Sequence, residues 1–473
     1  MRIFTINLAD CANEKTLRSD YKFHYGMSDN GWNLFDTPTI GNVRLSEILR
    51  EDYNLCPYDE GEEYRGIPTG QAYLDEDGDI IDYQYVTLDN HPERLKYSVT
   101  SDNILISSLR QAKSPALCFN EPNIKEYVFS NGFYIFKALD NWEPRFILYV
   151  LRSQKITNFI NNVIYRGIGI SSYNVSDLLN VQIRNVPVSE QRQALAHIKP
   201  FEDEIRKLKA NRVSTKSIID DVLTSEFGID AHSLHEIASE TIASTDFYHI
   251  ALNNSSLRFS NRWNKASRIQ DCLRQMSEHF RQLSKHISKT QNGYSPECSD
   301  DASELQVLAL DSLDYCGKLL TDRVKFSDTG RRDIEKFLLS DGDFLISRGN
   351  GSDGLISLAS IASINEDSPR TIFPDIMIRV TFHETVDVLY MAYVFNSFIG
   401  RLYFPFAAKG SNIKKTSKKE LYDFYVPLPR LEEQKRIALE IQSAIDAQSH
   451  TEMQISQLRE KIDTIIEYTL KAT

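Results

Sequence analysis

Long apolar runs and paired cysteines are both missing from this chain. No stretch of about 18 apolar residues occurs, so no membrane span is predicted. The start, residues 1–10, is too short and too soon interrupted to be a secretion signal. The six cysteines are scattered, without a Cys-x-x-Cys pair. These absences predict a cytoplasmic protein with reduced thiols rather than a disulfide framework or a zinc site.

Recognisable catalytic motifs are missing as well. The sequence has no Gly-x-Ser-x-Gly elbow, no phosphate-binding Gly-Lys-Ser/Thr loop and no Asn-Pro-Pro-Tyr methyltransferase motif. Residues 349–354 fit G-x-G-x-x-G, but residues 355–359 are β-like and do not begin the helix that a dinucleotide site requires. His232 and His235 lack a cluster of further ligands and are interpreted as surface residues. We therefore expect a chain that is not an enzyme and holds no metal or cofactor.

Charge is unevenly spread along the chain. The net charge of −12 argues against DNA binding at first, because phosphate contacts need Lys and Arg. Residues 51–82 hold eleven acidic side chains against one Arg, whereas residues 401–419 hold six basic side chains and no acid. Residues 258–289 hold eight basic side chains against two acidic ones. Each basic stretch is either a solvated face or part of a surface that meets nucleic acid.

The second half of the chain repeats the plan of the first. Residues 102–107 return as residues 342–347, an offset of 342 − 102 = 240, and residues 17–20 return at 257–260 with the same offset. Residues 177–192 return as residues 420–435, an offset of 420 − 177 = 243. A repeat of this length is too long for a solenoid unit. It indicates that a domain followed by a helix occurs twice in the chain. Such a pair of similar domains suits a target that itself has two parts.

Each half has a mixed pattern that ends in a long helix. In each half, alternating apolar residues predict strands, and apolar residues at helical spacing predict shorter helices. A long helical stretch without glycine then follows, at 189–226 in the first half and at 431–470 in the second. The expected strands are 83–88, 104–109, 128–136, 343–347 and 376–381, and the shorter helices are 146–163 and 386–399. Pro200 is expected to kink or restart the first long helix, and Gly228 to end it.

Both long helices carry an apolar seam at 3-4-3 spacing. We expect the two helices to pack on each other and to leave apolar surface for a partner; the alternative is an intramolecular coiled coil without a partner. The seam residues, predicted to form partner-binding helices, are Ile198, Phe201, Ile205 and Leu208 in the first helix and Ile455, Leu458, Ile462 and Ile465 in the second.

Two glycine-containing loops precede the long helices. Residues 409–415 and their counterpart 166–173 combine Gly with Ser, Asn, Arg or Lys, which suits contacts to phosphate. Arg348 stands before the glycine-rich turn of residues 349–354 and is placed to approach a phosphate or a base edge. For each of these segments a purely structural turn is the alternative.

The starts of the two long helices resemble a known family. Residues 426–437, Val-Pro-Leu-Pro-Arg-Leu-Glu-Glu-Gln-Lys-Arg-Ile, look like the signature that begins the conserved helix of type I restriction–modification specificity subunits. Residues 185–192 are a looser copy, and residues 342–351 resemble a strand and turn of the target recognition domains of that family. Through the repeat, the resemblance covers nearly the whole chain.

The resemblance implies a fold and a set of partners. It implies α/β (α+β) target recognition domains in tandem, each followed by a long helix, with the two helices in an antiparallel coiled coil. Each domain would read one half of a split, asymmetric site in double-stranded DNA. The helices would dock two methyltransferase subunits, which bind S-adenosylmethionine and flip the adenine, and restriction subunits that use ATP and Mg²⁺ would join through the complex.

The resemblance also sets boundaries and candidate residues. We expect target recognition domains at 1–187 and 236–429, a conserved helix and linker at 188–235, and a second conserved helix at 430–473. The acidic block at 51–82 is odd for a DNA-facing domain, so we expect it on the outer surface. The residues expected at DNA are Arg110, Gln111, Lys113, Arg166, Ser171, Ser172, Tyr173, Arg348, Asn350, Ser352, Lys409, Ser411, Asn412, Lys414 and Lys415.

Other classes of function remain open at this point. The chain is alternatively a coiled-coil adaptor that binds only protein, or a specificity-like subunit of another phage-defence methyltransferase system. A third alternative is a stand-alone nuclease with an unrecognised site. The basic loops separate the first alternative from the DNA-binding hypothesis, since reversing their charge would spare protein binding but weaken DNA binding.

Overall fold

The chain divides into two compact units. The computed structural model describes residues 31–37, 41–69, 73–75, 77, 79–108, 116–117, 123–164, 173–241, 260–299, 303–328, 333–350, 355–410 and 414–471. Unit 1 is Met1–Ala210 with Met453–Thr473, and unit 2 is Asn211–Glu452. Among the described residues, no helix is long and apolar enough to cross a membrane.

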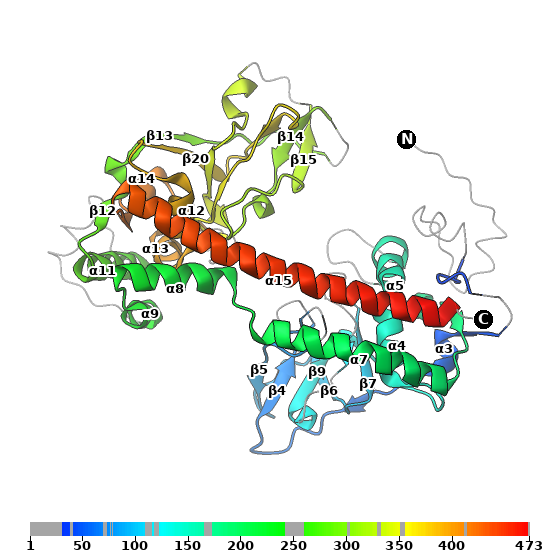
Figure 1. Ribbon diagram of the computed structural model, residues 1–473. Coiled ribbons are helices and arrows are strands. Elements are labelled where there is room, and N and C mark those ends of the chain that lie inside the picture. Colours follow the sequence, from blue (N-terminus) through cyan, green and yellow to red (C-terminus); the bar gives the residue numbers. More distant parts are fainter. Residues whose placement is uncertain are drawn as a thin grey trace. The chain divides into compact units, whose positions relative to one another are not determined.

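Unit 1 contains three small sheets (Figure 1). A four-stranded antiparallel sheet has the order β2 (Leu49–Glu51), β10 (Phe133–Ala138), β7 (Asn103–Ser107) and β8 (Ala116–Leu117). A five-stranded sheet has the order β3 (Asn54–Leu55), β6 (Leu95–Ser98), β9 (Tyr127–Ser130), β4 (Tyr64–Ile67) and β5 (Gln84–Val86), with β4 parallel to β9. A third sheet pairs β1 (Asn42–Arg44) with β11 (Gln182–Arg184).

Helices cover the four-stranded sheet of unit 1. Ile104 and Ile106 of β7 point into a core that also takes Phe146 and Val150 from the apolar side of a helix. The helices of unit 1 are α3 (Leu45–Ile48), η1 (Ile124–Glu126), α4 (Pro144–Arg152), α5 (Gln154–Phe159), the π-helical η2 (Ile160–Ile164), α6 (Val175–Leu179) and α7 (Val188–Ala210). The predicted helix 146–163 is thus split at Ser153, whose side chain caps α5 by accepting from the backbone N–H of Ile156.

The described residues of unit 2 form four sheets. A four-stranded sheet has the order β13 (Ile287–Asn292), β20 (Met377–Phe382), β16 (Phe344–Ser347) and β18 (Ala359–Ile361), and a three-stranded sheet has the order β15 (Val324–Ser327), β14 (Leu305–Leu308) and β19 (Thr371–Ile372). The other two sheets are pairs: β12 (Phe280–Gln282) with β22 (Tyr425–Pro427), and β17 (Gly349–Asn350) with β21 (Lys414–Lys415). The helices are α8 (Thr215–Phe227), α9 (Ala231–Ser239), α11 (Asn261–Met276), η3 (Leu283–Lys285), η4 (Leu310–Ser312), η5 (Ile334–Phe337), α12 (Val388–Asn396), α13 (Phe398–Ala407) and α14 (Lys418–Tyr422).

Several strands of the two units correspond in their order along the chain. The sheet β2-β10-β7-β8 of unit 1 corresponds to β13-β20-β16-β18 of unit 2. In each unit a further strand pairs with one antiparallel and one parallel neighbour: β4 with β5 and β9, and β14 with β15 and β19. The pair β1–β11 corresponds to β12–β22, and each is followed by a long helix.

A buried glutamine is placed identically at the start of each long helix. The Gln191 side-chain amide donates to the carbonyl oxygens of Val186 (2.8 Å) and Asn141 (3.1 Å) and accepts from the Glu143 N–H (2.8 Å). Gln434 does the same with Pro429 (2.8 Å), Thr385 (3.1 Å) and Asp387 (2.9 Å). Because each amide satisfies three backbone groups in the interior, the glutamine of each signature fixes the angle at which its helix leaves the domain.

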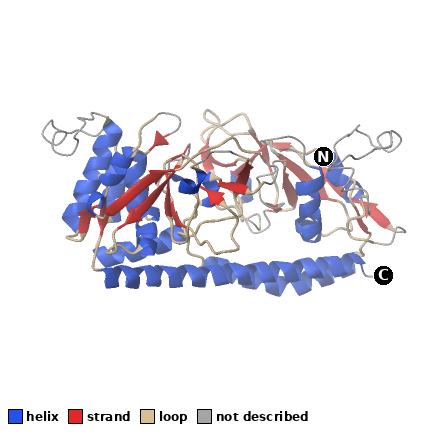
Figure 2. Ribbon diagram, turned by 90° about the horizontal axis from the view of Figure 1, so that it is seen from above, coloured by secondary structure: helices blue, strands red, loops and turns tan. Residues whose placement is uncertain are grey.

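The second long helix is α15 (Leu431–Lys471), which is unbroken over its length (Figure 2). It confirms the predicted helix 431–470. The predicted helix 189–226 is instead two helices, α7 and α8, because Ser214 caps a new helix by accepting from the Ser217 N–H. α7 continues through Pro200 rather than restarting there, and Gly228 ends α8 in the left-handed conformation at φ 61°.

The seam residues of the long helices lie in the interior of unit 1. Ile198, Ile205, Ile455 and Ile462 are buried, and Phe201, Leu208, Leu458 and Ile465 pack against the same core. Residues of both long helices thus share one core within unit 1, as expected for helices that pack on each other, and partner binding by these helices stays a prediction. An apolar seam at 3-4-3 spacing is satisfied equally well by a helix of the same chain, and here that is where it is used.

Candidate nucleic-acid interface

Two candidate segments of unit 2, far apart in sequence, pair as a short ribbon. Gly349 of β17 lies opposite Lys415 of β21, and Asn350 lies opposite Lys414. Lys409 joins the other side of β21, since its N–H donates to the Lys415 carbonyl at 2.9 Å and its carbonyl accepts from the Lys415 N–H at 2.7 Å. The sequence predicted these segments separately. The fold brings them together as one structure, here called the basic ribbon: Arg348, Lys409, Lys414 and Lys415.

Gly349 makes the close pairing possible. A Cβ at this position would lie 2.8 Å from the Lys414 carbonyl oxygen and 3.0 Å from Cγ of Lys415. The first of these contacts is with backbone, which cannot turn aside as a side chain does. Gly349 therefore serves the close approach of β21, and the next strand in the described part of the chain is β18, Ala359–Ile361.

Arg348 is anchored by its backbone and by its side chain. Its N–H donates to the Ile376 carbonyl at 2.7 Å, and its carbonyl accepts from the Thr416 N–H at 2.6 Å. Its Nε–H donates to the Thr416 carbonyl at 3.3 Å. The stem of this half-buried arginine is thereby fixed beside the ribbon, which reduces the entropy that it would lose on meeting a ligand.

The lysines of the basic ribbon differ in their surroundings. Nζ of Lys409 lies 3.4 Å from Oε1 of Glu420, a carboxylate that is only 2% exposed and belongs to the capping box of α14. Lys415 is exposed on the surface, and Lys414 is half-buried. Lys415 thus presents its charge to solvent, while Lys409 also neutralises a buried acid.

The neighbouring basic side chains have structural partners. Arg262 of α11 donates to the carbonyl oxygens of Gly410 (3.3 Å) and Pro405, and so stabilises the backbone next to Lys409 of the ribbon. Arg401 pairs with Asp220 of α8 at 2.5 Å; burial raises the pKa of that carboxyl although the guanidinium lowers it. Lys265 and Lys418 donate to carbonyl oxygens of Ala238 and Thr290, respectively. Charge runs in the sequence do not distinguish such supporting residues from surface ones.

Several predicted DNA contacts lie outside the described residues. They are Arg110, Gln111, Lys113, Arg166, Ser171, Ser172, Ser352, Ser411 and Asn412. Asn350 has a place in β17. Tyr173 lies in the core of unit 1, 4% exposed, where its ring packs against Tyr134 and its carbonyl accepts from the Tyr134 hydroxyl. That position takes the Tyr173 ring out of the candidate surface.

The acidic block of unit 1 is only partly on the outer surface. Glu60, Glu62 and Glu63 are exposed, as expected, but Asp75 is buried. Asp75, Asp77 and Asp79 bring their carboxylates within 4.8 Å of one another, an arrangement that suits a cation, and the position is taken by an ammonium group of the protein itself. No other group of possible metal ligands was found among the described residues.

Comparison with known proteins finds a family model that matches the part of the chain containing the ribbon. Residues 313–460 match the family model of the type I restriction modification DNA specificity domain. No curated protein matches the chain.

Three solved structures align over most of the chain. One belongs to a study of complex assembly and conformational transition of the type I R-M system, with 17% identity, 91% of this chain and 97% of that chain covered, and a TM-score of 0.40. The HsdS subunit from Thermoanaerobacter tengcongensis has 17% identity, coverages of 92% and 98%, and a TM-score of 0.35. The type-I restriction-modification system S subunit from M. genitalium has 12% identity, coverages of 91% and 96%, and a TM-score of 0.35.

The matched range contains β16, β17 and β21 together with the first 30 residues of α15, since 460 − 431 + 1 = 30. Residues 313–460 are therefore similar to type I restriction modification DNA specificity domains.

Proposed function

We propose that this chain is the specificity subunit of a type I restriction–modification complex and binds double-stranded DNA at a bipartite, asymmetric site. The observation that carries the proposal is the basic ribbon, which lies within the family-matched residues and joins Arg348 to Lys409, Lys414 and Lys415. Lysine at an exposed strand suits phosphate, and an anchored arginine suits the edge of a base. Arg348 and Asn350 are the proposed base-reading residues.

Two similar readers would serve the two halves of the site. The proposed target recognition domains are residues 1–187 and 236–429, and the matching order of elements in units 1 and 2 supports their equivalence. The loops that differ between the two would read different sequences. In the first domain, Arg110, Gln111, Lys113, Arg166, Ser171 and Ser172 remain the proposed contacts.

The long helices would form an antiparallel coiled coil that sets the distance between the half-sites. Contacts within unit 1 support this direction. Arg184, just before α7, donates to the Thr469 carbonyl near the end of α15 at 3.1 Å, whereas Lys209, near the end of α7, shares Asp77 with Arg459. The start of α7 thus lies beside the end of α15.

Partner subunits would dock on the outer side of α15. In unit 1 the large apolar side chains Met453 and Tyr468 are 58% and 75% exposed, and in unit 2 Leu439 is 68% exposed. Met453 and Tyr468 are 15 residues apart, which places them within about 60° of each other around the helix. We propose them, in addition to the predicted helix residues, as contacts for two methyltransferase subunits, through which restriction subunits would join.

The chemistry would reside in those partners. We propose that S-adenosylmethionine, ATP and Mg²⁺ bind to them and that this chain is not an enzyme. Incubating the isolated chain with DNA and Mg²⁺ tests this part of the proposal, because cleavage would show a nuclease site of its own.

DNA binding by the assembled methyltransferase complex tests the proposal as a whole. Lys415→Glu is compared with Lys325→Glu, a reversal at another exposed strand lysine of unit 2. Affinity for a random-sequence duplex is expected to fall several-fold for Lys415→Glu only, with a shallower salt dependence, because one phosphate contact is lost. Equal affinity of the two variants would refute the placement of DNA at the ribbon, and salt-independent binding by the wild type would refute the function.

A further inference from the structure

The connection between β4 and β5 of unit 1 folds three carboxylates toward one point. Oδ1 of Asp75 accepts from the N–H groups of Asp77 (2.8 Å) and Asp79 (2.9 Å), and the Asp75 N–H donates to the Asp79 carbonyl at 3.0 Å. A bridge between Leu74 and Ile80 closes the loop behind them. The backbone therefore holds the acidic side chains together despite their mutual repulsion.

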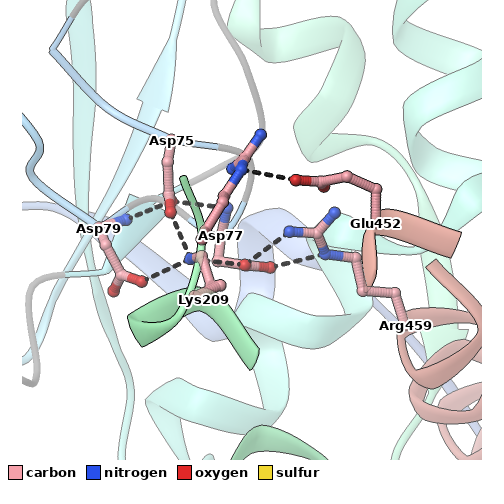
Figure 3. A network of polar contacts seen from close by, with 7 residues as sticks. Asp75, Asp77, Asp79, Lys209, Glu452 and Arg459 are labelled. Atoms are coloured by element: carbon pink, nitrogen blue, oxygen red, sulfur yellow. Dashed lines mark hydrogen bonds and ion pairs between the residues drawn. The ribbon is translucent and has the colours of Figure 1, made fainter. Parts of the chain in front are cut away.

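An ammonium group lies at that point. Nζ of Lys209, near the end of α7, contacts Asp75, lies 2.7 Å from Asp77 and lies 2.9 Å from Asp79 (Figure 3). An ammonium group has three N–H donors, so each carboxylate can receive one. The lysine satisfies the loop in the way that a bound cation would.

A second cation approaches from the other long helix. Arg459 of α15 donates from Nε to Oδ1 of Asp77 at 2.9 Å and from Nη2 to Oδ2 at 2.7 Å (Figure 3). This two-point contact is the geometry in which guanidinium and carboxylate bind most strongly. One loop is thus joined to both long helices of unit 1.

The charged side chains of this cluster are largely buried, which strengthens the interactions between them. The side chains of Asp75, Lys209 and Asp77 are 9%, 16% and 22% exposed. Burial alone would raise the pKa of Asp77, but the hydrogen bonds from Arg459 and Lys209 lower it to about 2. Likewise, burial lowers the pKa of Lys209, but its three carboxylate partners raise it above the usual range. Asp77 and Lys209 are therefore both charged at neutral pH.

We propose that Lys209 and Arg459 are positioning residues that hold the β4–β5 loop, and with it the five-stranded sheet of unit 1, on α7 and α15. Lys209 acts as a built-in cation where three aspartates would otherwise repel one another. The loop, the lysine and the arginine are together called the carboxylate clasp. That the sheet belongs to a DNA reader rests on the proposed function; the clasp itself does not.

Hydrogen exchange in the full-length chain tests the clasp without DNA. Lys209→Met removes the ammonium and keeps the length of the side chain. Exchange of the backbone N–H groups of Asp75, Asp77, Asp79 and Ile81 is expected to rise at least tenfold, while β20 of unit 2 exchanges as in the wild type. Lys207→Met is the matched control, since Lys207 is 75% exposed, two residues away on the same helix, and paired only with Glu204 at 3.6 Å in the described contacts.

Conservative variants keep the test informative if Lys209→Met unfolds unit 1. Lys209→Arg retains the charge and is expected to keep most of the protection, whereas Asp79→Asn, at the most exposed of the three aspartates, is expected to lose only part of it. Unchanged exchange in Lys209→Met would overturn the proposal. So would protection of the wild-type loop by millimolar Ca²⁺, because the ammonium would then not fill the cation position.

Discussion

The same connection is attached to the long helices by different chemistry in the two units. In unit 1 the β4–β5 connection uses the carboxylate clasp, with Lys209 of α7 and Arg459 of α15. In unit 2 the corresponding β14–β15 connection meets α8 through Cys316, 3.8 Å from the Thr215 hydroxyl, and through the Tyr315 ring, 4.2 Å from Nζ of Lys216.

The contact of that connection with α15 is also weaker in unit 2. Nζ of Lys318 lies 4.0 Å from Asp446, and both side chains are at least 60% exposed. Such an exposed pair contributes about 0–1 kcal/mol, whereas breaking a mostly buried network leaves uncompensated charges. The comparison teaches that two similarly ordered sets of strands keep the place of a contact but not its chemistry, so the two connections are held with different strength.

Breaking the clasp should have the largest effect. Asp77→Asn removes a charge that faces two cations and is expected to destabilise unit 1 by about 3 kcal/mol. Guanidinium denaturation, with hydrogen exchange of β7 and β10 as the report on unit 1, measures this loss. Asp203→Asn is the control on an exposed part of α7, with an expected loss below about 0.5 kcal/mol. Similar losses in both variants would remove the distinction between clasp and surface pair.

Acid should weaken unit 1 through the same residue. The pKa of Asp77 is lower in the folded protein, at about 2, than its usual value of 3.8, so its contribution is present above pH 3.8 and is lost as the pH falls through 2. The charged groups that face it include Lys209, Arg459 and Arg152 as well as Asp75 and Asp79.

The loss specific to Asp77 is expected to be about 2 kcal/mol between pH 5 and pH 2. It is measured as the difference in unfolding free energy between the wild type and Asp77→Asn at each pH. A difference that stays constant over this range would contradict the role assigned to the Asp77 charge.

Charge reversal of the basic ribbon tests whether this part of unit 2 binds DNA. Lys414→Glu with Lys415→Glu is expected to lower the affinity of the assembled complex for DNA about tenfold or more, and to reduce the salt slope by about 2, because two phosphate contacts are lost. Fluorescence anisotropy over a range of salt concentrations measures both values. Assembly with the methyltransferase subunits should be unchanged, which separates this result from loss of a protein adaptor.

Removing the unit 2 counterpart of the clasp should have the smallest effect. Lys318→Met takes away the exposed pair with Asp446 and is expected to change the stability of unit 2 by less than about 0.5 kcal/mol. Denaturation followed by exchange of β16 and β20 measures the change. A loss as large as that of Asp77→Asn would mean that both units are clasped equally.

Features set by local sequence were predicted well. The strands at 104–109, 343–347 and 376–381 correspond to β7, β16 and β20, because alternation of apolar residues is read directly from neighbours in the chain. The strand predicted at 128–136 is instead two strands, β9 and β10, which belong to different sheets. The long helix predicted at 431–470 from its glycine-free sequence is confirmed by α15. The break after Ala210 was missed because a single capping serine, Ser214, decides it.

Contacts between distant segments were beyond sequence reasoning. Arg348 and Lys415 were predicted as separate contacts, and only the pairing of β17 with β21 joins them. Ile198 and Ile455 were expected on faces where the two long helices pack on each other, and they share one core in unit 1; periodicity shows that a face is covered but not what covers it. The acidic block was placed on the surface, because nothing in its composition reveals that Lys209 lies among its carboxylates.

Sequencing of methylated adenines tests the central claim most directly. Cells that carry this chain together with its methyltransferase partner are compared with cells that carry the partner alone. The account predicts methylation at one split motif, with two different half-sites separated by a spacer of fixed length. Methylation at an undivided motif, or the same methylation in cells without this chain, would contradict it.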